Sequence, residues 1–287
     1  MFSGSIVAIV TPFANDAVDY EALGKLVDWH IEQGTDAIVP CGTTGESATF
    51  SHEEQHDVIG FVVERVAGRI PVIAGTGSNN TREAVSLAEN AARRGANGIL
   101  SVTPYYNKPT QEGLYQHYKA VREAVDLPLV LYNVPGRTGC NLLPETAARV
   151  ADLGNVDSVK EAAGSMDQIQ QLLNLGLRVL SGEDGLTFAA MCAGASGTIS
   201  VVANFAPRLV HDMCAATAAG ELVHARELHR KVWDLTQAAF CETNPIPAKT
   251  ALAEMGKIRE EYRLPLVPIS DAGRATVKAA LKRHGIL

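Results

Sequence analysis

Eight short stretches rich in valine, isoleucine and leucine recur along the chain, and the segments between them have the residue spacing of amphipathic helices. Their apolar residues are continuous instead of alternating with polar ones, which is typical of parallel strands buried on both faces. A strand–helix unit repeated eight times predicts an α/β fold, namely a closed (β/α)8 TIM barrel of roughly 250 residues. The stretches are Ser5–Phe13, Ala37–Gly42, Pro71–Gly77, Gly98–Pro104, Pro128–Pro135, Val156–Glu161, Arg178–Gly182 and Gly197–Asn204.

The segments between these stretches carry signals for helix starts and helix ends. Ser51 and Glu54 match a capping box, in which each side chain bonds the backbone N–H of the other residue, and Asn80 with Glu83 indicates a second box. Glycine tolerates the left-handed conformation that commonly ends a helix. It follows four of the segments, at Gly34, Gly68, Gly95 and Gly176.

An open, doubly wound parallel sheet is the alternative to a closed barrel. That fold normally carries a glycine fingerprint for a dinucleotide, and the chain has no GxGxxG motif. Beyond Asn204 the pattern is helical only, as far as Leu287. We therefore predict a barrel domain over residues 1–220 and a C-terminal helical extension over residues 221–287.

Charge and hydropathy limit the partners that we expect. The net charge is −7 at pH 7, the pI is about 5.6, and no run of basic residues occurs. Nucleic acid and an anionic membrane surface are therefore not expected as partners. The segment Gly185–Pro207 has no charged residue, but glycine and polar residues interrupt it. It predicts a buried helix followed by a buried strand and not a membrane span.

Cysteine usage and the start of the chain indicate the compartment. The first lysine is Lys25, so the N-terminal region lacks the positive charge of a signal peptide. The cysteines are scattered, odd in number and without a CxxC pair, which fits a reducing cytoplasm and neither a disulfide framework nor structural zinc. We expect a cytoplasmic protein. The five cysteines are Cys41, Cys140, Cys192, Cys214 and Cys241.

The second apolar stretch runs into Gly42-Thr43-Thr44-Gly45-Glu46-Ser47, at the end of a strand where barrels carry their chemistry. The glycines permit a tight turn with backbone N–H groups pointing inward, and the threonines add hydroxyls, so this loop suits a small carboxylate. It is not a P-loop, because no Gly-Lys-Ser/Thr follows. An ordinary glycine-rich turn is the alternative.

Lys160 ends the sixth stretch, and Tyr132 lies near the end of the fifth. If these stretches are adjacent parallel strands, the amine and the phenol emerge side by side, an arrangement that suits Schiff-base chemistry on a carbonyl compound. Apolar surroundings favour this chemistry, because burial disfavours the ammonium form and lowers the pKa of the lysine. The alternative is a lysine that caps a strand and reaches into solvent.

Other strand ends offer further side chains to the same face. Tyr105 and Tyr106 follow the fourth stretch, although tyrosines in loops more commonly pack at interfaces. Arg137 follows the fifth stretch, where it either clamps a carboxylate or lies at the surface. Small residues near Gly182 and Ser200 either leave room over the amine or fill the barrel.

A metal-dependent mechanism is not expected. None of the eight histidines lies in a predicted strand or directly at a strand end. The single His-x-x-x-His pair, His52 and His56, lies at the start of an outer helix. A metal-dependent aldolase needs ligands in the mouth of the barrel, so we predict no metal.

Three motifs stand in order at the strand ends: the Gly42–Ser47 loop, Tyr132-Asn133-Val134-Pro135-Gly136-Arg137-Thr138-Gly139, and Lys160-Glu161-Ala162. Together they resemble the dihydrodipicolinate synthase family, over the whole chain. The first and third motifs also occur in a wider family of pyruvate-dependent class I aldolases and lyases. Arg137 within Arg-Thr-Gly is the feature that points to the narrower family.

The resemblance implies a mechanism. Lys160 forms a Schiff base with pyruvate, and Tyr132 relays protons at the imine and enamine. Thr44 links Tyr132 to Tyr106, which in this family comes from the partner subunit. No external cofactor is required. The subunits assemble as a homotetramer, a dimer of dimers.

The resemblance also implies where the substrates bind. Thr43 and Thr44 hold the pyruvate carboxylate, and Arg137 receives the carboxylate of L-aspartate 4-semialdehyde. Gly182 and Ile199 line the pocket through their backbone carbonyls. The product is 4-hydroxy-tetrahydrodipicolinate, an intermediate of lysine and diaminopimelate biosynthesis.

Members that are inhibited by L-lysine bind it at a dimer interface, and the resemblance implies such a site here. Gln55 stands where some members have a histidine, which puts the strength of inhibition in question, although glutamine still forms hydrogen bonds. A capped helix start with solvated polar residues is the alternative. The matching residues are Ser47, Ala48, His52, Gln55, Asn79, Glu83 and Tyr105.

Two other functions are alternatives for this chain. A sugar-acid aldolase of the N-acetylneuraminate lyase or 2-keto-3-deoxy sugar-acid aldolase type shares the Schiff-base lysine, but Arg137 disfavours it. A non-catalytic barrel that senses keto acids has no need of a complete proton relay, so the set of Lys160, Tyr132, Thr44 and Tyr106 disfavours that reading.

Overall fold

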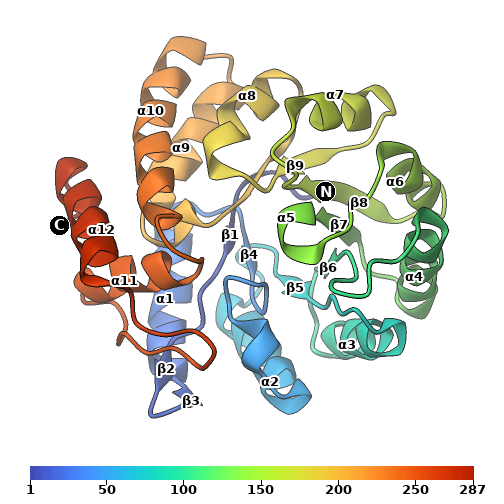
Figure 1. Cartoon of the computed structure of the whole chain (residues 1–287), viewed down its shortest axis with the longest axis horizontal. Helices are drawn as coiled ribbons and strands as arrows, with labels where there is room; N and C mark the ends of the chain where they lie inside the picture. The colour runs from blue at the N-terminus through green and yellow to red at the C-terminus, as the bar shows by residue number, and fades with distance from the viewer.

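The chain forms a closed parallel barrel surrounded by helices (Figure 1). The structure, a computed structural model, describes all residues, 1–287. The strand order is β4-β1-β10-β9-β8-β7-β6-β5. Hydrogen bonds of 3.0 Å from Ile38 N to Pro71 O and from Gly75 N to Pro40 O join β4 to β5 and close the ring. The predicted (β/α)8 barrel is confirmed.

The barrel strands are short and all parallel, and one antiparallel hairpin lies outside them. The barrel strands are β1 Gly4–Ala8, β4 Ala37–Val39, β5 Ile73–Gly75, β6 Gly98–Val102, β7 Leu129–Asn133, β8 Val156–Glu161, β9 Val179–Ser181 and β10 Gly197–Ser200. The hairpin strands are β2 Phe13–Ala14 and β3 Ala17–Val18.

Helices cover the outside of the barrel and continue beyond its last strand. The α-helices are α1 Tyr20–Glu32, α2 His52–Val66, α3 Thr81–Arg93, α4 Gln111–Ala124, α5 Pro135–Thr138, α6 Pro144–Ala151, α7 Met166–Asn174, α8 Thr187–Cys192, α9 Pro207–Ala218, α10 Leu222–Ala239, α11 Ile246–Glu254 and α12 Asp271–Arg283. Three 3-10 turns are η1 Ser47–Thr49, η2 Asp184–Leu186 and η3 Val202–Asn204.

Two local expectations are wrong. The first predicted strand, Ser5–Phe13, ends already at Ala8, because the N–H of Val10 bonds the Asn204 side chain (2.9 Å) instead of a neighbouring strand, and Phe13 starts the hairpin. The capping box at Asn80 does not form. Glu83 accepts hydrogen bonds from Ser78 and from His52 (2.5 Å), so its carboxylate is not available to the backbone of Asn80. The box at Ser51 and Glu54 is confirmed.

Alternate residues of each strand face two separate cores. On β7, Val130 and Tyr132 point into the barrel, whereas Leu129 and Leu131 pack against the outer helices. The inner core contains 13 buried residues and the outer core 55, so most apolar burial lies between the strands and the helices. This alternation decides which strand residues reach the mouth of the barrel.

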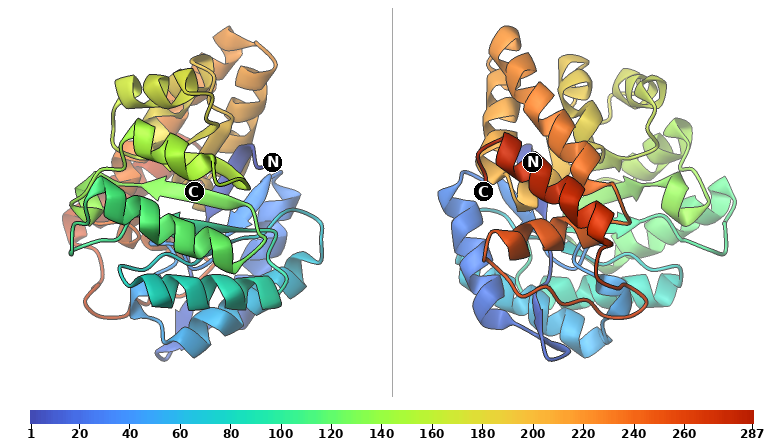
Figure 2. Two further views of the ribbon diagram at one scale, coloured as in Figure 1. Left: turned by 90° about the vertical axis from the view of Figure 1, so that its right-hand side faces the viewer. Right: turned by 60° about the vertical axis from the view of Figure 1, so that its left-hand side comes forward.

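The chain beyond β10 is mainly helical, as predicted, and its two longest irregular segments are 240–245 and 255–270 (Figure 2). The predicted domain boundary at residue 220 falls in the turn between α9 and α10, which pack against each other. The division into two units stays a prediction. No helix combines the length and the apolarity needed to cross a bilayer.

A buried ion pair connects the C-terminal helices to the mouth of the barrel. Lys249 Nζ on α11 lies 2.5 Å from Glu46 Oε1, and neither side chain is exposed at all (0% each). The ammonium also lies 4.3 Å from the centre of the Phe13 ring. Glu46 has a φ of 59°, a left-handed conformation that is uncommon outside glycine. The ion pair therefore holds the last residues of the Gly42–Ser47 loop in one arrangement.

We predict that Lys249→Met destabilises the fold by about 3–5 kcal/mol, because Glu46 is left as an uncompensated buried charge. Adding Glu46→Gln should recover much of this loss, since the double variant buries no net charge. Urea unfolding followed by circular dichroism measures both effects. Equal stability of Lys249→Met and the native chain would contradict the prediction.

Candidate active site

Lys160 and Tyr132 lie side by side on adjacent strands. They are paired in the β7–β8 register, so both side chains point into the barrel. The Lys160 Nζ atom lies 4.0 Å from the centre of the Tyr132 ring. Only 6% of Lys160 and 8% of Tyr132 is exposed, and neither polar group has a hydrogen-bond partner within the chain. The strand-end pair expected from the sequence is therefore formed, with the amine over the ring face.

Burial changes the proton affinity of both groups. Loss of hydration lowers the pKa of Lys160 to about 8; the nearby Asp184 carboxylate opposes this change, and Arg137 adds to it. A shift of about 2.5 units raises the neutral, nucleophilic fraction of the amine near pH 7 by roughly 300-fold. Burial raises the pKa of Tyr132 to about 12, so the phenol keeps its proton at neutral pH. The site thus holds a reactive amine beside a phenol that can donate a proton.

Gly182 leaves the space that the lysine side chain occupies. A Cβ atom at this position would lie 3.2 Å from Lys160 Cε and 2.7 Å from the Cβ of Ala162. Any larger residue would therefore push on the strand end that carries the amine. Gly182 lines the cavity, as expected.

The Gly42–Ser47 loop presents threonine N–H groups to the cavity. The N–H groups of Gly45 and Glu46 are used inside the turn, on the carbonyls of Gly42 and Thr43 (both 3.0 Å). Those of Thr43 and Thr44 have no acceptor within the chain. These two bonds close the turn, Gly45 allows it to lie close to the Ile9 carbonyl, and the threonines supply the free donors that a carboxylate needs.

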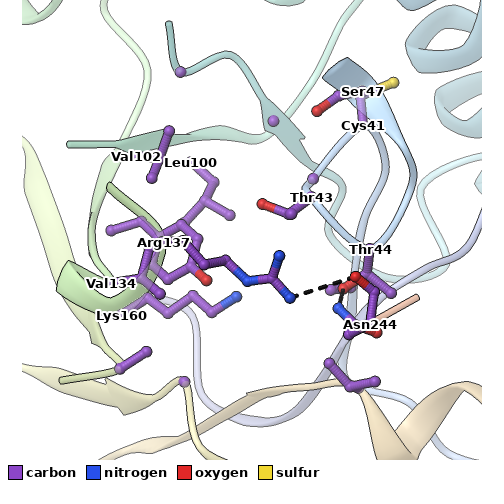
Figure 3. A pocket seen from close by; sticks show the side chains of 18 of the residues that line it. Cys41, Thr43, Thr44, Ser47, Leu100, Val102, Val134, Arg137, Lys160 and Asn244 are labelled. Carbon is purple, nitrogen blue, oxygen red and sulfur yellow. Dashed lines mark hydrogen bonds between the residues drawn. The ribbon is translucent and has the colours of Figure 1, made fainter. Parts of the chain in front are cut away.

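A cavity of about 100 Å³ lies between the lysine and this loop. Figure 3 shows the Arg137 guanidinium projecting across it from α5, with Lys160 on one side and Thr44 on the other. Arg137 donates a hydrogen bond to the backbone oxygen of Asn244 (3.4 Å). The cavity thus presents an amine, free backbone donors and a guanidinium, a set that suits a small keto acid and a second carboxylate.

Two polar side chains that line this cavity, those of Asn244 and Glu183, were given no role from the sequence. Asn244 precedes α11, and Glu183 follows β9 with a carboxylate whose pKa burial raises. Glu183 stands in a strand-end run, which was a usable signal, whereas Asn244 lies in the C-terminal part and carries no positional signal. No group of three or more His, Cys, Asp or Glu side chains is placed to hold a metal ion.

Two predicted residues lie outside the cavity of the single chain. Tyr106 is 89% exposed on the loop after β6, and it makes no hydrogen bond to Thr44. Ile199 is fully buried on β10, and Val201 lines the cavity in its place. The roles given to Tyr106 and Ile199 stay predictions.

A second cavity, of about 330 Å³, adjoins the first, and the residues that line both are Thr43, Ser47, Gly77, Val102, Val134 and Arg137. Asn79 does not line this cavity but donates a hydrogen bond to the Tyr105 carbonyl (3.1 Å). The amide of Gln55 is partly used, because its Nε2 donates to Gly75 O (2.8 Å). Six of the seven residues predicted for L-lysine line the cavity, namely Ser47, Ala48, His52, Gln55, Glu83 and Tyr105.

Comparison with known proteins agrees with this geometry. The sequence model of the dihydrodipicolinate synthetase family matches residues 1–284. The chain belongs to this family. A 4-hydroxy-tetrahydrodipicolinate synthase of Geobacter sulfurreducens is 54% identical over 290 residues, which cover 100% of both chains.

Solved structures of the family show the same fold. The chloride-inhibited dihydrodipicolinate synthase of Acinetobacter baumannii, solved with pyruvate, is 50% identical with a TM-score of 0.98, and 100% of each chain is covered. The enzyme from Cyanidioschyzon merolae, solved with lysine bound, is 38% identical with a TM-score of 0.97, over 100% of this chain and 99% of that one. The family membership favours the synthase reading over a sugar-acid aldolase or a non-catalytic barrel.

We predict that imine formation with pyruvate accelerates as the pH rises and levels off above a midpoint near 8, because only neutral Lys160 attacks the ketone. Tyr132, with a pKa of about 12, keeps its proton over this range and adds no second midpoint. Mass spectrometry after reduction with cyanoborohydride measures the rate, with Lys160→Ala as the blank. A midpoint near the ordinary lysine value of 10.5 would contradict burial as the activating factor.

Proposed function

We propose that the chain condenses pyruvate with L-aspartate 4-semialdehyde to give 4-hydroxy-tetrahydrodipicolinate. The observation that carries this is the buried Lys160 amine beside the Tyr132 phenol, in a cavity that Arg137 crosses. The names of its relatives and its membership of the family support the same reaction.

The chemistry follows from the amine. Neutral Lys160 adds to the ketone carbon of pyruvate, and the carbonyl oxygen leaves as water, which forms the imine. Loss of a methyl proton gives the enamine, whose carbon attacks the aldehyde of the second substrate. The amine of that substrate then adds to the imine carbon and displaces Lys160, which closes the ring and frees the enzyme. The protons balance without an oxidant or reductant.

The remaining residues position the substrates and move protons. Tyr132 gives a proton to the oxygen that leaves as water and exchanges protons with Thr44. Thr43 and Thr44 bind the pyruvate carboxylate through their free N–H groups. Arg137 binds the carboxylate of L-aspartate 4-semialdehyde in the outer part of the cavity. Gly182 gives room to Lys160, and Ile199 contributes a backbone carbonyl to the base of the site.

The active form is proposed to be a homotetramer built as a dimer of dimers. Tyr106 supports this, because an 89% exposed tyrosine that misses its own cavity is free to complete the cavity of a second subunit. Its φ of 72° shows that the loop holds it in an uncommon conformation. The five cysteines are free, which supports a cytoplasmic location.

Product identification in the native chain and in Arg137→Ala tests the reaction. The native chain should convert both substrates to the cyclic product. Arg137→Ala should still trap pyruvate on Lys160 but lose about 2–3 kcal/mol in kcat/KM for the semialdehyde, as expected for a lost charge-assisted contact.

Arg149→Ala is the matched control, because this exposed arginine on α6 bonds Glu112 and lies outside both cavities. Arg149→Ala should keep the native pyruvate trapping and the native kcat/KM for the semialdehyde. Cleavage of N-acetylneuraminate or a 2-keto-3-deoxy sugar acid, with no cyclic product, would favour the sugar-acid aldolase instead. Pyruvate binding with neither reaction would favour the sensor.

We also propose that L-lysine inhibits the enzyme from the second cavity. Glu83 is the carboxylate available to an ammonium group there, and hydrogen bonds from Ser78 and then His52 lower its pKa, so it is ionised at neutral pH. The cavity adjoins the active site through Thr43, Ser47 and Arg137. Tyr105 lies beside Tyr106 in the chain, so an effector that contacts Tyr105 is placed to disturb the proton relay.

We predict that Glu83→Ala removes inhibition by L-lysine while uninhibited turnover changes little, because Glu83 lies outside the active-site cavity. Glu89→Ala, an exposed change on the same helix, is the control and should keep the inhibition. Steady-state rates with and without millimolar lysine measure both. If L-lysine inhibits Glu83→Ala as strongly as the native chain, the proposed lysine site is wrong.

A further inference from the structure

Asn244 joins the two substrate-binding parts of the cavity from a distant part of the chain. It lies between α10 and α11, is 5% exposed and lines the cavity. Its Nδ2 donates a hydrogen bond to Thr44 Oγ1 (3.0 Å), and its backbone oxygen accepts from Arg137 Nη2 (3.4 Å). Figure 3 shows these contacts on the side of the cavity opposite Lys160. The contact to Thr44 also determines where the Thr44 hydroxyl proton points.

The hydrogen bond from Asn244 sets the direction of the Thr44 proton. A threonine hydroxyl has one proton to donate and two lone pairs that accept. Since Thr44 Oγ1 accepts from Asn244, its own proton points away from that amide. Thr44 has no other side-chain hydrogen bond, and the phenol of Tyr132 has none either. The hydroxyl is therefore a donor without an acceptor, inside a cavity that also contains Tyr132.

Helix α11, which begins two residues after Asn244, holds this amide against the loop. Lys249, five residues after Asn244, pairs with Glu46, two residues after Thr44. Both contacts thus join the same two segments, and the ion pair is fully buried. The other side of the amide, Oδ1, is buried and has no donor. Donation to Thr44 is therefore the one hydrogen bond that the Asn244 side chain makes.

We propose that Asn244 is a positioning residue that makes the Thr44 hydroxyl a one-way donor toward the Tyr132 oxygen. The inference rests on the proposed function and deepens it. As the carbinolamine C–O bond breaks, its electron pair leaves with the oxygen and the Lys160 nitrogen lone pair forms the C=N bond. The Tyr132 proton goes to the departing oxygen to form water, the Thr44 proton goes to the Tyr132 oxygen, and a proton returns to Thr44 from solvent by way of Tyr106, the residue proposed above to complete the relay.

Two substitutions at Asn244 separate this role from simple packing. Asn244→Asp keeps the shape but supplies only acceptors, so the Thr44 hydroxyl turns and donates to the carboxylate. Asn244→Ala leaves the hydroxyl free to point either way. We expect kcat to fall in the order native, Asn244→Ala, Asn244→Asp, with at least about a tenfold loss in Asn244→Asp. A packing role predicts the opposite order, because the isosteric variant preserves the contacts.

The measurement is kcat at saturating substrates as a function of pH, compared on the plateau above the Lys160 midpoint of each variant, because the new carboxylate raises the pKa of the amine. Asn90→Asp is the matched control, because Asn90 also has a buried, unpartnered Oδ1 but lies on α3 outside both cavities. It should keep the native kcat. Thermal melts of all variants show whether a loss of rate follows a loss of folded protein.

A double-mutant cycle with Thr44→Val covers the case in which Asn244→Asp fails to fold. If Asn244 acts through the hydroxyl, Asn244→Ala should cost nothing further once that hydroxyl is absent. An equal fold-loss in both backgrounds would overturn the proposal, as would a kcat of Asn244→Asp at or above that of Asn244→Ala. Failure of the native chain to trap pyruvate on Lys160 would instead refute the proposed function itself.

Discussion

Folding removes water from the Lys160 ammonium, and the reactivity of the whole site depends on this loss of hydration. The strand register places the amine at the top of the inner core, over the ring of Tyr132, where no protein group accepts its hydrogen bonds. Its pKa falls to about 8. More polar surroundings would stabilise the ammonium form and leave Lys160 unreactive. Equally buried surroundings without the Asp184 carboxylate would lower the pKa of Lys160 further. The barrel therefore sets the reactivity through burial, moderated by the carboxylates of Asp184 and Glu183.

The C-terminal helices complete the site and do more than cover the barrel. Lys249 holds Glu46, and Asn244 holds Thr44, so two contacts fix the Gly42–Ser47 loop from outside the strand–helix repeat. The left-handed residue of the loop is Glu46 and neither of its glycines, so the loop needs a contact that selects this conformation. The fully buried ion pair supplies that choice. The conformation of the Gly42–Ser47 loop, the direction of the Thr44 hydroxyl and the position of α11 therefore depend on one another.

The positions of Lys160, Tyr132 and Arg137 were predictable because strand periodicity and barrel topology bring strand ends together whatever the details of packing. Asn244 and Lys249 were not, since each contacts a partner about two hundred residues away and no periodic pattern marks them. The box at Asn80 failed because Glu83 found closer partners in Ser78 and His52, which local sequence rules do not consider. The register of the barrel follows from the pattern of the chain, whereas pairings between distant side chains need the folded structure.

The most direct test of the buried amine is to reduce the complex with pyruvate by borohydride and map the labelled peptide. We predict a single pyruvate-derived group per chain, located on Lys160, and none in Lys160→Ala although that variant keeps its fold. Label on another lysine, or a native chain that takes up no label, would contradict the Schiff-base mechanism on which the proposed function depends.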